Sequence, residues 1–194
     1  MNNQDKKDQI IEAAARIFAA KGFHQAKMDD IALEAGVAKG TLYYNYSSKS
    51  KLFAATVTQG LNRIMTAIDD SLDSDLPFPE HFHTIVDTLI RLYAANSEVT
   101  RIYANELSAG IDDTVLREIR QVRHRFTAFL ETNLKTGQEK GYLRPLSPRL
   151  SALTVTGIID AMAGHHLEHP DQDSLDDIIE TVHTILSTGM LLPD

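Results

Sequence analysis

The sequence predicts an all-α protein of about nine helices. Apolar residues recur at steps of three and four along most of the 194-residue chain, which is the spacing of one face of an amphipathic helix. No segment shows a strict apolar and polar alternation bounded by hairpin turns, so we expect no strands. Ser147 and Ser174 stand where helix caps are preferred, and Pro148 suits the first turn of a helix.

Composition restricts the class of protein further. The chain is 43% hydrophobic and 24% charged, as in an ordinary globular protein, and it has no cysteine for a disulfide. No apolar run approaches the roughly 20 residues of a membrane-spanning helix, and the N-terminal MNNQDKKDQ lacks the apolar core of a signal peptide. We therefore expect a cytoplasmic protein without a membrane partner.

The first predicted helix follows a polar arm at residues 1–8. Ile10, Ala14 and Phe18 lie at helical spacing, and Gly22 is expected to end the helix.

Residues 28–51 predict a helix-turn-helix followed by the start of another helix. Gly36 can adopt the positive φ that ends one helix sharply. Ile31, Val37 and Leu42 are expected to meet in the core between the helices. In such a motif the second helix enters the DNA major groove.

The second helix of this motif, at about residues 38–45, carries the candidate DNA contacts. At 3.6 residues per turn, Ala38, Leu42 and Tyr46 would face inward. The remaining side chains offer hydroxyl groups, a methyl group for thymine and cations for phosphate, while Lys49 begins the next helix, where a phosphate is favoured. The predicted DNA-binding residues are Lys27, Lys39, Gly40, Thr41, Tyr43, Tyr44, Asn45 and Lys49. Taken singly, either tyrosine could instead be a half-buried aromatic, and Lys49 a solvated charge.

The distribution of charge is compatible with DNA contact at one end. The net charge is −8, but residues 1–51 hold 8 Lys/Arg and 6 Asp/Glu, whereas the remainder holds 11 and 21. A mildly basic head on an acidic body would approach DNA head first.

The stretch from about Ile10 to Phe53 resembles the DNA-binding domain of the TetR family of repressors. It contains AxxxFxxKGF, IAxEAGVxKGTLYYxY and SKxxLF, without gaps. The resemblance implies a DNA-binding domain at residues 1–51 and a helical domain at 52–194 that dimerises and often binds a ligand. Three positions depart from the family pattern: Lys27 replaces a Ser or Thr cap, Tyr46 replaces Phe, and Lys51 replaces an acidic residue that would complete a capping box with Ser48.

Helices continue beyond the predicted DNA-binding domain. A helix from Ser48 towards Asp70 joins the head to the body, and SLDSDLPFPE then breaks the pattern. A long helix is expected from about Asp113 to Glu139, ended by Gly141 and Pro145.

Aromatic and aliphatic residues of the body predict a ligand cavity between helices, although each of them alone could be plain core. Arg120, Arg123, His124 and Arg125 are compatible with an amphipathic or anionic ligand, and residues 102–163 are weakly similar to fatty-acyl-sensing members of the family. The candidate ligand-binding residues are Met65, Phe82, Val86, Leu89, Tyr93, Tyr103, Leu107, Phe126 and Phe129.

The last two predicted helices are the candidate dimer interface. One has small residues at steps of three and four, the other a wide apolar face, and two copies of the pair could form a four-helix bundle. The resemblance points to the same pair. The interface residues are Leu153, Gly157, Ala161, Gly164, Ile178, Val182, Ile185 and Leu186. The alternative is that both faces pack within their own subunit.

Three of the eight histidines crowd together in HHLEHPD. His165, Glu168 and His169 fit H-x-x-E-H, a zinc-hydrolase pattern, but Pro170 ends the helix there and a third protein ligand would be needed. A solvated helix end, where histidines meet the helix dipole favourably, is the commoner explanation of such a cluster. We therefore predict no cofactor and no catalytic residue.

Together these observations predict a homodimeric, ligand-responsive repressor that binds a pseudo-palindromic operator and is released by a small-molecule inducer. The alternatives are a helical metal-dependent hydrolase that uses the HHLEH stretch, a constitutive DNA-binding protein without ligand, and a helical interaction protein that does not bind DNA.

Overall fold

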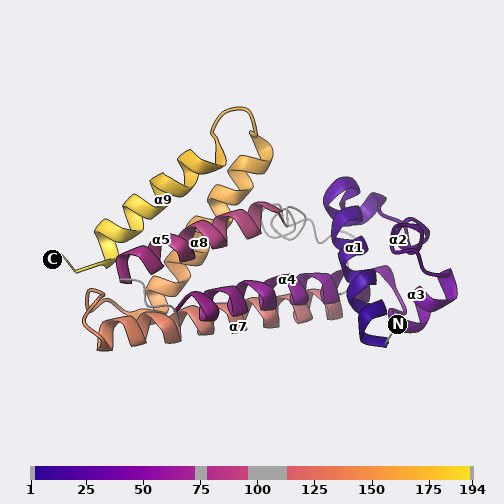
Figure 1. The fold of residues 1–194 in the computed structure, drawn as a ribbon, viewed down its shortest axis with the longest axis horizontal. Coiled ribbons are helices and arrows are strands. Elements are labelled where there is room, and N and C mark those ends of the chain that lie inside the picture. The colour runs from indigo at the N-terminus through magenta and orange to yellow at the C-terminus, as the bar shows by residue number, and fades with distance from the viewer. Residues whose placement is uncertain (1–2, 73–77, 96–112, 193–194) are drawn as a thin grey trace.

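The computed structural model describes residues 3–72, 78–95 and 113–192, and within these ranges it contains eight helices and no strand (Figure 1). The all-α prediction is confirmed. The helices are α1 (Asn3–Gln25), α2 (Met28–Glu34), α3 (Lys39–Asn45), α4 (Lys49–Leu72), α5 (Phe78–Ala95), α7 (Asp113–Glu139), α8 (Pro148–Glu168) and α9 (Leu175–Met190). No helix in the described ranges is long and apolar enough to cross a membrane.

The N-terminal helices α1, α2 and α3 form a small head around three phenylalanine rings. Phe18 and Phe53 meet edge to face with ring centroids 5.0 Å apart, and Phe23 and Phe53 do so at 5.2 Å. The helical path of α1 is interrupted at Gly22, whose φ of 76° is left-handed, so the predicted break at this glycine is confirmed. Phe23 is thereby turned back onto the core of the head.

The turn between α2 and α3 is closed by Gly36, which has a φ of 62°. Its N–H donates to the carbonyl of Leu33, and the N–H of Val37 donates to the carbonyl of Ala32, both at 3.0 Å. These two bonds satisfy the last carbonyl groups of α2 in the manner of a Schellman motif. The predicted positive φ is therefore confirmed.

On the inner side of α3 the prediction is only partly right. Leu42 is completely buried and Tyr46 is half-buried, as expected. Ala38 is exposed, because it occupies the N-cap of α3 and precedes the first helical turn.

Helix α4 connects the head to the body. Its N-terminal and middle parts pack on α1, where Gln59 donates to Asp8 at 3.0 Å and Arg63 pairs with Glu12 at 3.2 Å. Its second half packs against α5 and runs beside α7 (Figure 1). Helix α4 is therefore in contact with both the head and the body.

The body is built in layers on the α4–α7 pair. Helices α5 and α8 lie on this pair, and α9 covers α5 and α8 from outside (Figure 1). Ser147 and Ser174 cap α8 and α9 with their side chains, and Gly141, with φ of 78°, ends α7. The predicted helix starts and the predicted span of α7 are confirmed.

Candidate nucleic-acid interface and ligand cavity

Helix α3 presents its outer side to solvent at the end of the molecule farthest from α9 (Figure 1). The side chain of Tyr44 is 84% exposed and that of Tyr43 is 42% exposed, whereas Thr41 is half-buried. Gly40 is exposed, and a Cβ atom added to it would meet nothing within 4 Å. The protein's own packing therefore does not require glycine at this position.

Two predicted cationic contacts, Lys27 and Lys39, are exposed. Lys27 occupies the N-cap of α2, and its side chain makes no capping hydrogen bond, in keeping with its replacement of a Ser or Thr cap. The ammonium group of Lys39 lies 2.7 Å from Asp29 on α2, and the hydrogen bond from Lys39 to Asp29 raises the pKa of Lys39. Both side chains are exposed to solvent, and that of Lys39 is paired with Asp29.

Two other predicted contacts are turned inward. The Asn45 amide donates to the carbonyl of Thr41 at 2.8 Å, and its Oδ1 atom is buried. The ammonium group of Lys49 donates to the carbonyls of Phe23, His24 and Ala26 at 2.6, 3.1 and 3.0 Å. Asn45 and Lys49, which the sequence predicts as DNA contacts, thus have polar side-chain atoms engaged within the protein.

Lys49 instead holds the end of α1 against the start of α4. Its ammonium group also lies 4.5 Å from the centre of the Phe23 ring. A lysine placed on the last carbonyl groups of a helix satisfies those acceptors and complements the helix dipole. Burial lowers the pKa of Lys49, yet three donated hydrogen bonds require the protonated form.

We expect Lys49→Met to lower the free energy of unfolding by about 2–3 kcal/mol, because charge-assisted hydrogen bonds contribute about 1.5–3 kcal/mol and the carbonyls would lose their partner. Urea unfolding followed by circular dichroism measures the change. Lys51→Met is the matched control, since Lys51 is exposed and its side chain lies outside this cluster. Equal stability of the two variants would contradict the assigned role of Lys49.

An apolar cavity lies in the body between α4, α5, α7, α8 and α9. Its volume is about 60 Å³, against about 300–1,000 Å³ for typical ligand pockets. Asn133 is its one polar lining residue. The lining residues are Ile68, Phe82, Ile85, Val86, Leu89, Leu130, Asn133, Leu134, Leu143, Val155 and Leu186.

Of the predicted ligand-binding residues, Phe82, Val86 and Leu89 line this cavity. Four others do not: Met65 and Phe129 are half-buried against the core, and Tyr93 and Phe126 are buried beside each other with ring centroids 6.3 Å apart. Tyr103 and Leu107 lie outside the described residues. The sequence did not single out Ile68, Leu130 or Val155, since their apolar spacing is that of any core position.

Among the described residues, the side chains of the HHLEH stretch are not part of a group of three or more that is close enough to share a metal ion. α8 ends at Glu168, and His169 is the residue that caps it. The ring of His165 is 2.8 Å from the Asp173 carboxylate, and His166 approaches the backbone of Asp173 at 3.4 Å. These contacts close the loop between α8 and α9.

Two family profiles match the chain. The profile described as "Bacterial regulatory proteins, tetR family" matches residues 10–56, and the one described as "Tetracyclin repressor-like, C-terminal domain" matches residues 75–164. The chain belongs to the TetR family. It is thus a transcriptional regulator whose head, α1 to α3, is a helix-turn-helix DNA-binding unit.

Similar proteins include fatty-acid regulators. The HTH-type transcriptional regulator YhgD of Bacillus subtilis is 25% identical over 87% of this chain and 88% of its own length. The "Fatty acid metabolism regulator protein" of B. subtilis is 23% identical over 78% of each chain. Among solved structures, the fatty acid degradation regulator FadR from Bacillus halodurans has a TM-score of 0.79 and 26% identity, covering 93% of this chain and 94% of its own. FadR from B. subtilis in complex with stearoyl-CoA has a TM-score of 0.76 and 21% identity, covering 93% and 97%.

TetR-family regulators dimerise. In this member the predicted interface residues on α8 and α9 fall into an exposed group and a buried group. Leu153 is 50% exposed and Ile185 is 57% exposed, and Gly157 and Ala161 are exposed as well. Four others are buried within the protomer: Gly164, Ile178, Val182 and Leu186. Leu150, 63% exposed one turn before Leu153, was missed by the sequence analysis and belongs to the same exposed side of α8.

Proposed function

We propose that this TetR-family regulator is a homodimeric repressor that binds a pseudo-palindromic operator and is released by an amphipathic ligand with a long acyl chain. The observation that carries the proposal is a single helix, α4, which begins beside the exposed recognition helix and reaches the apolar cavity through Ile68. DNA and ligand would therefore act on opposite ends of one rigid element.

The DNA-binding part of the proposal rests on the outer side of α3. Tyr43, Tyr44 and Thr41 offer hydroxyl groups to base edges and phosphates. Lys39 would exchange its exposed Asp29 partner for a phosphate group, and Lys27 would meet the DNA backbone beside it. Each lost base contact would cost about 1–3 kcal/mol of discrimination.

Gly40→Ala should change stability and operator affinity in opposite directions. Alanine should stabilise α3 by up to about 0.5–1 kcal/mol, because glycine is the poorer helix former and the added Cβ meets nothing in the protein. Operator affinity should nevertheless fall, since the glycine allows a close approach of the helix to DNA. Thermal unfolding and fluorescence anisotropy with labelled operator measure the two effects, and undiminished affinity would contradict the proposed approach.

The ligand part rests on the chemistry of the cavity and on the helix beside it. Only Asn133 is polar among the lining residues, so the cavity suits a hydrocarbon chain. Arg120 and Arg125 are exposed on α7, one to three turns from Leu130, and could meet an anionic head group. Arg123 is already engaged in an ion pair with Asp160 of α8, whose pKa is raised by burial. The stearoyl-CoA complex of the structurally similar B. subtilis protein makes that compound the first probe to try.

The small volume of the cavity determines how a long ligand would have to act. A cavity of about 60 Å³ holds only a short part of an acyl chain, so a long chain would have to push the surrounding helices apart. Because α4 forms one wall, this opening would tilt the DNA-binding heads. The same small volume also favours the second candidate, a constitutive DNA-binding protein that no ligand releases.

Selection of DNA from a random pool by the purified protein tests the proposal. An enriched inverted repeat, from which stearoyl-CoA releases the protein, is the expected result. An inverted repeat that neither stearoyl-CoA nor shorter acyl-CoAs release would favour the constitutive protein. Failure to enrich any sequence would overturn the operator-binding proposal itself.

A further inference from the structure

Helices α5 and α9 are antiparallel neighbours with a fixed register. Arg91 on α5 pairs with Asp87 one turn earlier, at 2.9 Å, and with Asp176 of α9, at 2.6 Å. Two turns away from this ion pair, His83 of α5 lies opposite His183 of α9, with ring centroids 4.6 Å apart. The ion pair and the edge-to-face contact of the two imidazole rings thus lie along the same α5–α9 contact.

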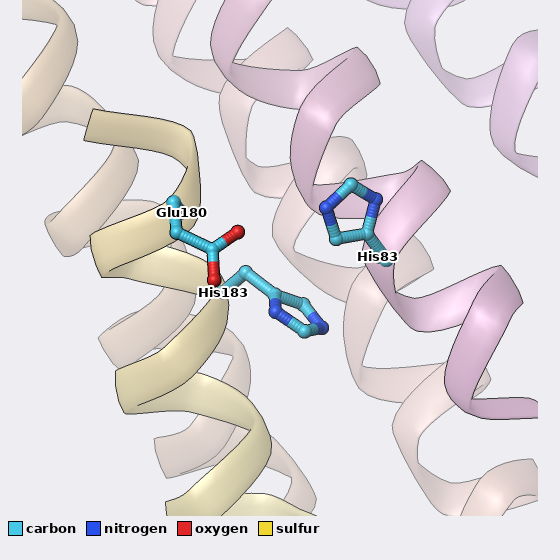
Figure 2. A group of neighbouring side chains, drawn as sticks. All are labelled: His83, Glu180 and His183. Carbon is cyan, nitrogen blue, oxygen red and sulfur yellow. The ribbon is translucent and has the colours of Figure 1, made fainter. Parts of the chain in front are cut away.

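Glu180 completes a group of three metal-binding side chains (Figure 2). One ligand atom from each of His83, Glu180 and His183 lies within 4.8 Å of the others. In the part of the chain that the structure describes, this is the one group of three or more such residues close enough to share an ion. Glu180 and His183 are three residues apart and so project from one side of α9, the Glu-x-x-His spacing that helix bundles use to hold metals.

We propose that His83, Glu180 and His183 bind a divalent transition-metal cation of the Zn²⁺, Co²⁺ or Ni²⁺ type, which clamps α5 to α9. Two imidazoles and one carboxylate suit such cations better than they suit Mg²⁺ or Ca²⁺, which prefer oxygen ligands. Water would complete the coordination. His83 and Glu180 are exposed and His183 is half-exposed, so an ion can enter from solvent without unfolding.

Small side-chain movements suffice to close the site. Tetrahedral zinc with bonds of about 2.0–2.1 Å places its ligand atoms about 3.3 Å apart. The three atoms lie within 4.8 Å before any ion is bound, and exposed side chains can shift by the difference without backbone movement.

A cation bound at this site would act on two of the helices that surround the cavity. Phe82, which precedes His83, and Leu186, one turn after His183, both line the cavity. A cation would therefore fasten two of the helices that a ligand has to separate. His183 and Ile185 point about 160° apart around α9, so the site lies on a different flank from the exposed Ile185 and needs no second subunit.

Cation binding to the untagged, full-length protein tests the proposal. Titration with Zn²⁺ against a chromophoric chelator should show one cation per chain, and Co²⁺ should give the visible absorption of a low-symmetry site. Saturating Zn²⁺ should raise Tm by several degrees, because a cation that binds only the folded state stabilises it.

Variants at exposed positions decide which residues hold the cation. His83→Ala and Glu180→Gln should each weaken Zn²⁺ binding by at least about tenfold. Loss of a side chain that only hydrogen-bonds to a metal ligand already has an effect of this size. The matched control is His165→Ala with His169→Ala, which should leave affinity and stoichiometry unchanged. Circular dichroism without metal confirms that each variant is folded.

Two results would overturn the proposal. One is the absence of saturable binding at 100-fold excess of Zn²⁺ over protein. The other is binding that survives His83→Ala and Glu180→Gln but disappears in the His165 and His169 variant, which would assign the cation to the end of α8. Retained operator binding in all these variants would show that the metal site and DNA recognition are separate properties.

Discussion

Replacing Leu153 with glutamate should convert the proposed dimer into a monomer and weaken binding to a full operator by about 100-fold or more. Leu153 is half exposed on α8, in line with the exposed Gly157 and Ala161, where a second subunit would bury it. A carboxylate in that position would lose its hydration without a partner. Because two linked heads bind two half-sites about 10²–10⁴ times more tightly than one, loss of the dimer removes that gain.

Sedimentation velocity and anisotropy with the selected inverted repeat measure the two effects. Ile185→Glu on α9 should behave like Leu153→Glu, since Ile185 is the exposed apolar residue of that helix. Ala128→Glu is the control for an added charge, because Ala128 is exposed on α7. A dimeric Leu153→Glu variant that binds with unchanged affinity would place the interface elsewhere.

The helix-turn-helix could be predicted because its determinants are local. Gly36 needs a positive φ to close the turn, and its partners Leu33 and Ala32 are only a few residues away. The bounds of α7 follow equally from signals within the helix and from Gly141 directly after it. Each of these features depends on neighbours that the linear sequence displays.

The apolar faces of α8 and α9 show where such reasoning ends. Periodicity identifies Val182, Leu186 and Ile185 as apolar positions of α9, but it does not say which surface covers each of them. In the structure Val182 and Leu186 are buried within the protomer, whereas Ile185 is exposed. The choice depends on the placement of α5 and α8, which belongs to tertiary packing.

The roles of some side chains depend on partners that are distant in the sequence and could therefore not be predicted from it. The ammonium group of Lys49 meets carbonyls that lie 23–26 residues earlier in the sequence, and no local pattern signals that contact. His83 and Glu180 are almost a hundred residues apart, so a search for metal-binding spacing finds HHLEH and passes over them. Only the register of α5 against α9 brings the two together.

The second large effect is expected on the coupling between DNA and ligand. Saturating operator should lower the affinity for stearoyl-CoA by the same factor by which stearoyl-CoA lowers operator affinity, typically about 5–150-fold, or about 1–3 kcal/mol. The coupling would run through α4, because this helix packs on α1 in the head and lines the cavity with Ile68. Since half-sites are spaced by about 34–36 Å per helical turn, a shift of the heads by a few ångströms would prevent simultaneous docking.

Met65→Ala should alter this coupling more than it alters ligand-free operator binding. Met65 is half-buried against the core on α4, away from the recognition helix and outside the cavity lining, so its loss would loosen the connection without removing a contact to either ligand. Met162→Ala is the matched control, because Met162 is also half-buried against the core but lies on α8. Four affinities are measured for each protein: operator with and without stearoyl-CoA, and stearoyl-CoA with and without operator. If the wild type bound stearoyl-CoA equally well in both states, α4 would transmit no signal and the protein would be a constitutive DNA-binding regulator.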